Sequence, residues 1–208
     1  MLELAIRAFT TFFATVGPVD VAALFAVLSA SASDRQRRSM ALKGVAIATV
    51  LLLSFLVLGT ETLKWMGITL PALRTAGGIL LLLMAVDMVF ARPSGMTAPT
   101  VAETTEAEHK PDISVFPLAT PLIAGPGALG AAVLLGAEAE SHWMREVVVI
   151  AAMLAVMAIT LALLLIAARL HRFLGVTGQN VITRVVGILL AALAVQFLFD
   201  GVRTSGLV

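Results

Sequence analysis

The chain has 208 residues, of which 60% are hydrophobic and 13% are charged, and its mean hydropathy is +1.02. These values are typical of a membrane protein and exclude an ordinary soluble domain. A net charge of +1 without a basic run argues against a nucleic-acid partner. The absence of cysteine excludes disulfides, thiolate catalysis and cysteine metal sites.

Six apolar segments are long enough to cross a membrane as helices. The longest polar connection between them covers 92–111, and we expect it to be a polar cytoplasmic loop. The fold class is therefore an all-α polytopic membrane protein with one transmembrane domain, 1–208. The six expected spans are 6–31, 41–63, 68–90, 112–136, 147–168 and 181–199.

The first and fourth of these segments contain a Gly-Pro pair that interrupts a helix. Pro18 and Pro126 each remove a backbone donor and clash with the preceding turn, and Gly17 and Gly125 favour helix poorly. An unpaired backbone group in hydrocarbon costs several kcal/mol, so such breaks persist only against protein or a wet cavity. We expect helices 1 and 4 to be broken near mid-membrane, with a plain structural kink as the alternative.

The two halves of the sequence repeat at a constant offset of 108 to 109 residues. Each half holds three spans, so the second copy enters the membrane in the opposite sense. The result is an inverted repeat of the kind found in many secondary transporters. We expect repeat 1 to cover 1–91 and repeat 2 to cover 112–208. The matches are Gly17-Pro18 with Gly125-Pro126, Gly78 with Gly187, and Asp87 with Gln196.

Lysine and arginine are unevenly distributed between the two expected membrane faces. The connections after spans one, three and five hold eight of these residues, and the opposite face holds four. The positive-inside rule therefore places those connections in the cytoplasm and both termini outside.

Charged and polar side chains inside the spans face the bundle interior and indicate function by default. Asp20 lies near the middle of the first span, where it either caps the half-helix that begins at Pro18 or has a ligand- or proton-linked role. Arg74 and Arg184 are expected to reach the membrane interface or to pair with aspartates. Asp87 and Gln196, which match in the repeat, either hold helices together through hydrogen bonds or belong to a binding site. The candidates for a coupling or charge network are Asp20, Arg74, Asp87, Arg184, Gln196 and Asp200.

The two breaks also predict how a substrate is bound. A half-helix that begins at a break presents free N–H groups and a partial positive charge, which suit a carboxylate. Carbonyls released before each break accept hydrogen bonds from an ammonium group, and the small residues around them leave room for a small zwitterion. The candidate substrate-binding residues are Thr15, Gly17, Pro18, Thr120, Ala124, Gly125, Pro126 and Gly127.

Three segments, 70–80, 117–128 and 190–197, resemble the MarC family of bacterial and archaeal membrane proteins. The resemblance covers essentially the whole chain and implies six helices in the cytoplasmic (inner) membrane. For some members it also implies ion-coupled transport of small neutral amino acids such as glycine and alanine. Family members typically carry Asn-Pro-Ile-Gly at the first break, where this chain reads Gly17-Pro18-Val19-Asp20.

We therefore predict a secondary transporter of small neutral amino acids that works by alternating access and is coupled to Na⁺ or H⁺, without a cofactor or bound metal. An exporter of other small metabolites and a channel with a broken-helix pore are the alternatives. An enzyme is not expected, because His109, His142 and His171 fall in loops and no HExxH or P-loop motif occurs. The expected partners are a small-molecule substrate and the lipid bilayer, with no nucleic acid, and an oligomer is compatible with the sequence.

Overall fold

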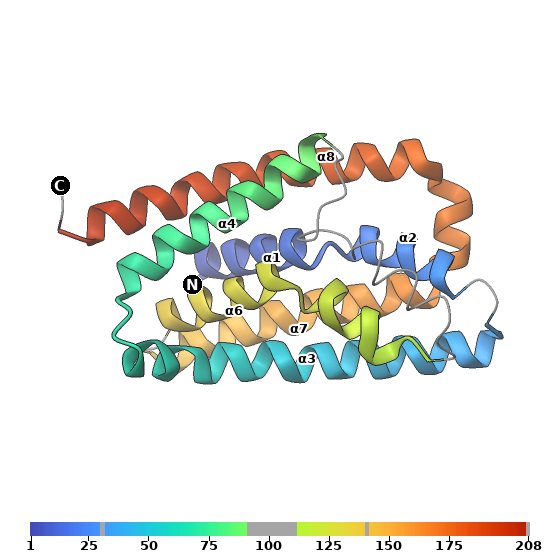
Figure 1. Cartoon of the computed structure of the whole chain (residues 1–208), viewed down its shortest axis with the longest axis horizontal. Coiled ribbons are helices and arrows are strands. Elements are labelled where there is room, and N and C mark those ends of the chain that lie inside the picture. The colour runs from blue at the N-terminus through green and yellow to red at the C-terminus, as the bar shows by residue number, and fades with distance from the viewer. Residues whose placement is uncertain (30–31, 91–111, 140–141, 207–208) are drawn as a thin grey trace.

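The structure is a computed structural model that describes residues 1–29, 32–90, 112–139 and 142–206. The described residues form helices joined by short turns, as their apolar composition predicts (Figure 1). The expected loop at 92–111 lies outside the described residues. In chain order the helices are α1 (Leu2–Val16), α2 (Pro18–Leu28), α3 (Asp34–Trp65), α4 (Leu70–Phe90), η1 (Ser114–Ile123), α6 (Pro126–Ala139), α7 (Trp143–Leu165) and α8 (Ala167–Thr204).

Within the described residues, five helical segments are long and apolar enough to cross a membrane, and a sixth span is obtained if η1 and α6 count as one. The first of the five joins α1 and α2 into Leu2–Leu28, and the last covers Asn180–Thr204 within α8. The expected connection before the last span is helical instead, because α8 already begins at Ala167. No proline occurs between Ala167 and Thr204, and glycine alone weakens a helix without removing a hydrogen-bond donor.

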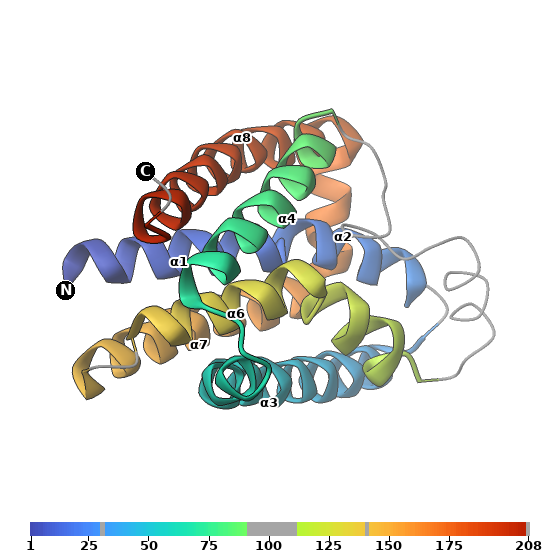
Figure 2. The same cartoon turned by 60° about the vertical axis from the view of Figure 1, so that its left-hand side comes forward.

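The helices form one bundle in which each broken span packs on an unbroken partner. α1 and α2 lie against α7, η1 and α6 lie against α3, and α4 runs along α8 in the most extensive contact of the bundle (Figures 1 and 2). Both chain ends lie at the same end of the bundle, together with the start of α4 and the end of α6 (Figure 1). We call this end the terminal face.

Two glycines, one in α4 and one in α8, bring these helices close together. A Cβ atom on Gly78 would lie 2.9 Å from the carbonyl oxygen of Ala194, and one on Gly187 would lie 2.8 Å from Cβ of Met88. Both glycines therefore pack against the backbone or the stem of a side chain of the facing helix, and a larger residue at either position would push the helices apart.

The outer surface of the bundle is apolar, as a lipid environment requires. Large hydrophobic side chains are exposed along several helices, including Val50, Leu83, Leu154 and Ile188. Inside, a small cluster that includes Ala14, Leu81, Met84 and Leu134 joins α1, α4 and α6 and is completed by residues of α8.

Candidate functional site

The first break lies at Gly17, between α1 and α2. Gly17 has φ 59° and ψ 57°, a left-handed conformation that glycine adopts at little cost. Its N–H bonds to the carbonyl of Phe13 at 3.1 Å, so α1 ends with a paired donor. Pro18 is the first residue of α2, where its missing N–H is harmless. The helix is thus interrupted as predicted, although α2 continues in the general direction of α1 (Figure 1).

The second break is more severe. η1 is loosely wound, with Pro117 and Pro121 inside it and extended backbone angles at Phe116 and Thr120. α6 begins anew at Pro126, and the two helices are bent by 60°. The prediction that helices 1 and 4 are broken is confirmed.

An ion pair between α1 and α6 fixes the relative depth of the two breaks. Nη2 of Arg7 lies 2.5 Å from Oε2 of Glu138. At 1.5 Å per residue, Gly17 lies roughly 15 Å along α1 from Arg7, and Pro126 lies roughly 18 Å along α6 from Glu138. Because α1 and α6 also pack against each other, the two breaks lie at similar distances from the terminal face.

Glu138 is the centre of an ion cluster at the terminal face. Besides Arg7, it contacts Arg74 of α4, whose Nε lies 3.3 Å from Oε1 of Glu138. The side chain of Glu138 is 5% exposed, against 34% for Arg7 and 19% for Arg74. The cluster therefore joins α1, α4 and α6 through one buried carboxylate.

This cluster differs from the expectation drawn from the sequence. Arg74 was expected at the interface or paired with an aspartate such as Asp87, and Glu138 was expected in a loop. Instead, Glu138 belongs to the last turn of α6 and pairs with Arg74. Sequence reasoning missed Glu138 and Arg7 because the cluster joins three segments that are distant in the chain; the one available signal was a carboxylate directly after a long apolar run.

Asp20 connects the first break to α8. Its Oδ1 accepts a hydrogen bond from the hydroxyl of Thr183 at 2.5 Å, and its Oδ2 lies next to Gly17. Among the described residues, the carboxylate accepts no backbone N–H of α2. The predicted capping contact is therefore not observed, and the link to α8 stands in its place.

The two threonines predicted near the breaks are engaged within their own segments. The buried hydroxyl of Thr15 donates to the carbonyl of Thr11 at 2.8 Å. The hydroxyl of Thr120 lies 3.5 Å from the carbonyl oxygen of Val115. Both hydroxyls therefore donate to carbonyls of their own segments.

The small residues of the second break are packed tightly. Ala124, Gly125 and Gly127 are buried, whereas the ring of Pro126 is exposed. A Cβ atom on Gly127 would lie 2.8 Å from Sδ of Met84 in α4. The cavity here has about 10 Å³, roughly the space of one water molecule. Its lining residues are Gly77, Leu80, Leu81, Pro126, Gly127, Gly130, Ala131 and Leu134.

The remaining charge-network candidates do not join this site. Nε2 of Gln196 donates to Oδ1 of Asp200 at 3.0 Å within α8. Among the residues that the structure describes, neither Asp87 nor Arg184 has an ion-pair partner. Nor does that part of the chain contain a group of three or more His, Asp and Glu side chains placed to hold a metal ion.

The comparisons with known proteins agree with this architecture. Residues 2–205 match the family described as MarC family integral membrane protein. The chain belongs to the MarC family. A UPF0056 membrane protein of Methanocaldococcus jannaschii is 36% identical over 203 residues, which is 97% of each chain. Relatives named in the same way occur in Bacillus subtilis, at 32% identity over 98% of this chain and 96% of the relative, and in Escherichia coli, at 32% over 94% and 90%. No solved structure matches.

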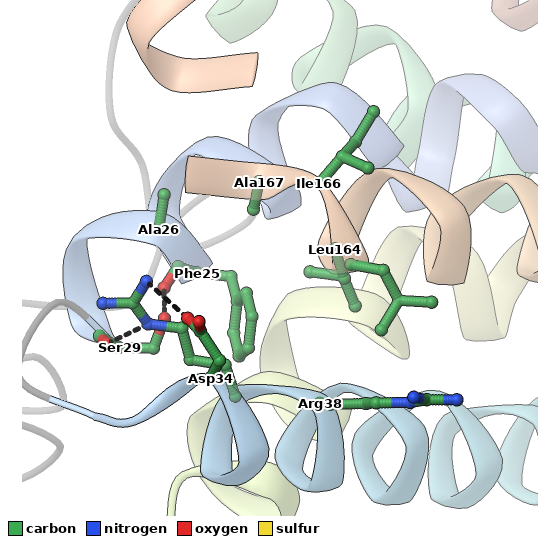
Figure 3. A pocket seen from close by; sticks show the side chains of 10 residues that line it. Phe25, Ala26, Ser29, Asp34, Arg38, Leu164, Ile166 and Ala167 are labelled. Atoms are coloured by element: carbon green, nitrogen blue, oxygen red, sulfur yellow. Dashed lines mark hydrogen bonds and ion pairs between the residues drawn. The ribbon is translucent and has the colours of Figure 1, made fainter. Parts of the chain in front are cut away.

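The described residues of this MarC-family bundle also line a larger pocket toward each end. At the terminal face, a pocket of about 450 Å³ is lined by Arg7 and Glu138 of the ion cluster, together with Met1, Glu3, Leu4 and Arg145. At the opposite end, a pocket of about 440 Å³ lies between the end of α2, the start of α3 and the end of α7. Figure 3 shows Ser29 and Asp34 on one wall of this second pocket and Leu164 and Ile166 on the other. Nε of Arg37, which also lines it, donates to the carbonyl of Ser29 at 2.8 Å.

Proposed function

We propose that this MarC-family protein is a secondary transporter of small neutral amino acids, such as glycine and alanine, coupled to Na⁺ or H⁺. The observation that carries the proposal is the pair of helix breaks at Gly17 and Gly125, which lie at similar depth in two packed helices. In hydrocarbon, such breaks are maintained where they border protein or a ligand path.

The packing of the helices supports two inverted halves. If the halves are equivalent, spans 1, 2 and 3 correspond to spans 4, 5 and 6. The contact of α1 and α2 with α7 then corresponds to that of η1 and α6 with α3. Likewise, α2 packs on α8 as α6 packs on α4, and α4 and α8 form the contact between the third members of each half. Every main contact thus has an equivalent under the exchange of halves.

The chemistry at the second break suits a small carboxylate. The first N–H groups of α6 lack helical acceptors, and the N-terminal end of the helix dipole favours negative charge. No acidic residue lies in the first turn of α6, whereas Asp20 occupies that position in α2. The buried Ala124, Gly125 and Gly127 restrict the side chain of a substrate to small groups.

The small size of the cavity at the second break indicates that the structure is closed to a substrate at this point. A cavity of about 10 Å³ does not admit glycine, so α4 and α6 have to separate before a substrate binds there. The ion cluster of Glu138 holds those two helices together at the terminal face. Alternating access would therefore involve opening this cluster on one side of the membrane.

Transport in proteoliposomes tests the proposal. Radiolabelled glycine and alanine are offered with an inward sodium gradient, with a proton gradient and with neither. Saturable uptake that responds to one gradient, together with counter-flow exchange, is expected of a carrier. Uptake that neither saturates nor exchanges would indicate a channel. Absence of uptake and of any ligand-induced rise in melting temperature for either amino acid would contradict the proposed substrate class.

A further inference from the structure

Thr11 is a fully buried residue of α1 whose hydroxyl has no partner. Its exposed fraction is 0%, and among the described residues its Oγ1 and Nε of Arg74 are the buried side-chain atoms without a hydrogen bond. A buried polar atom without a partner is unfavourable, and such an atom in a native structure calls for a ligand or an ordered water.

The hydroxyl of Thr11 differs from most other helical hydroxyls in the described part of the chain, because it has no hydrogen-bond acceptor. A serine or threonine in a helix commonly donates to the carbonyl four residues earlier. For Thr11 that acceptor would be the carbonyl of Arg7, and the bond is absent. Among the residues that the structure describes, the following make this bond: Thr10, Thr15, Ser29, Thr49, Ser54, Thr62, Thr75, Thr160 and Thr204.

Helix geometry places Thr11 one helical turn farther from the terminal face than Arg7 of the ion cluster, on the same side of α1. Residues four and seven apart share one face of a helix, so Arg7, Thr11 and Ala14 lie in one stripe of α1. Arg7 contacts Glu138 of α6, and Ala14 packs in the cluster that contains Leu134 of α6. Thr11 lies between them on the stripe, about 6 Å deeper than Arg7 at the usual helical rise. It therefore faces the junction of α1 with α4 and α6.

Arg74 supplies a second unused donor at the same junction. Its Nε lies 3.3 Å from Oε1 of Glu138, but the N–H is not directed closely enough at that oxygen to form a hydrogen bond. The junction thus holds two groups without a hydrogen bond: the Nε–H of Arg74 beside the buried carboxylate of Glu138, and the hydroxyl of Thr11 about one helical turn deeper along α1. Two donors suit a carboxylate ligand, and Glu138 suits an ammonium group.

We infer that Thr11 and Arg74 form a zwitterion-binding site one helical turn inside the ion cluster, distinct from the two breaks. The carboxylate of an amino acid accepts hydrogen bonds from the Thr11 hydroxyl and from Nε–H of Arg74, while its ammonium group faces Glu138. The inference rests on the proposed function and adds an intermediate binding site on the transport path between the terminal face and the breaks. The stripe of α6 through Glu138, Leu134 and Ala131 leads on from this site to Gly127.

Glycine binding to the purified protein tests the role of the hydroxyl. Thr11→Val removes the hydroxyl at nearly constant volume, whereas Thr11→Ser keeps it. Thr160→Val is the matched control, because Thr160 is equally buried but donates to the carbonyl of Val156 within α7. We expect Thr11→Val to weaken glycine binding roughly five- to tenfold, the effect of one hydrogen bond, with Thr11→Ser and Thr160→Val near the parent protein. Unchanged binding by a folded Thr11→Val variant would overturn the assignment.

Thiol labelling tests the location of the site without assuming any substrate. The chain has no cysteine, so the Thr11→Cys variant contains a single thiol, at position 11. We expect a water-soluble methanethiosulfonate reagent to label it at least tenfold faster when Glu138→Gln opens the ion cluster. Thr160→Cys, with and without Glu138→Gln, is the control and should show no such difference. Equal labelling rates for Thr11→Cys in both backgrounds would refute the site. Faster labelling combined with no glycine binding by the parent protein would refute the proposed substrate class alone.

Discussion

Glu138 and Arg7 are separated by 131 residues of sequence and are joined by a 2.5 Å ion pair at the terminal face. The pair aligns α1 with α6, so that Gly17 and Pro126 lie at similar depth. Arg74 adds α4 to the same carboxylate. One buried side chain thereby positions both broken helices and the helix that borders the second break.

Glu138→Gln is expected to destabilise the bundle. The substitution removes the countercharge of two arginines, and the lost charge-assisted bonds are worth about 1–3 kcal/mol. The free energy of unfolding, or the melting temperature in a fixed detergent, measures the effect. Glu146→Gln is the control, because Glu146 is exposed in the first turn of α7. Equal stability of the two variants would show that the cluster contributes nothing.

Gly78→Ala is expected to disturb the contact between α4 and α8. The new Cβ would lie 2.9 Å from the carbonyl oxygen of Ala194, so the helices have to separate at a cost of about 1–3 kcal/mol. Gly130→Ala provides a contrast within a helix, because no atom lies within 4 Å of its added Cβ. That variant should be neutral or stabilised by about 0.5–1 kcal/mol. Similar melting temperatures for both variants would argue against close packing at Gly78.

Gly127→Ala is expected to reduce transport about tenfold in a folded protein, an effect equivalent to about 1.4 kcal/mol. The added methyl group would lie 2.8 Å from Sδ of Met84 and would restrict the space between α4 and α6 next to the small cavity that Gly127 lines. The double variant Gly127→Ala with Met84→Ala returns that space and should recover part of the rate. Initial uptake rates in proteoliposomes measure both effects. Full transport by the single variant would indicate that this space is not used by the substrate.

Asp20→Asn is expected to change the dependence of transport on pH or on sodium. The carboxylate lies beside the first break and is tied to α8 through Thr183. Thr183→Val removes the donor but keeps the charge, so coupling should be retained in that variant. Uptake measured across pH values and sodium concentrations distinguishes the effect of Asp20→Asn from that of Thr183→Val. The same dependence in Asp20→Asn as in the parent protein would leave Asp20 with a structural role only.

Asp112 is expected to stabilise the fold in a defined pH window. Hydrogen bonds from the side chain and backbone of Ser114, and from Lys43, lower the pKa of this aspartate to about 2 from its ordinary value of 3.8. A lowered pKa in the folded state stabilises the fold above pH 3.8, and the contribution is lost as the pH falls toward 2. The melting temperature of Asp112→Asn should therefore lie below that of the parent at pH 6 and converge with it near pH 2. A constant difference would contradict this.

The sequence alone determined the apolar spans and the positions of both helix breaks, because hydropathy and the missing N–H of proline are local properties. It also matched Gly78 with Gly187 through the repeat offset, whereas the packing of both glycines between α4 and α8 came from the structure. The connection expected between the spans 147–168 and 181–199 is instead part of α8, since glycines without a neighbouring proline do not have to end a helix.

Only the tertiary structure decided which polar side chains meet. Glu138 follows an apolar run and reads as a loop residue until α1 and α4 bring two arginines to it. Thr11 and Thr15 are both threonines of the same apolar segment, so the sequence does not distinguish them. In the structure the hydroxyl of Thr15 donates to a carbonyl of its own helix, whereas that of Thr11 has no partner. Such differences depend on the packing of helices that are distant in the chain, and hydropathy and local spacing carry no information about that packing.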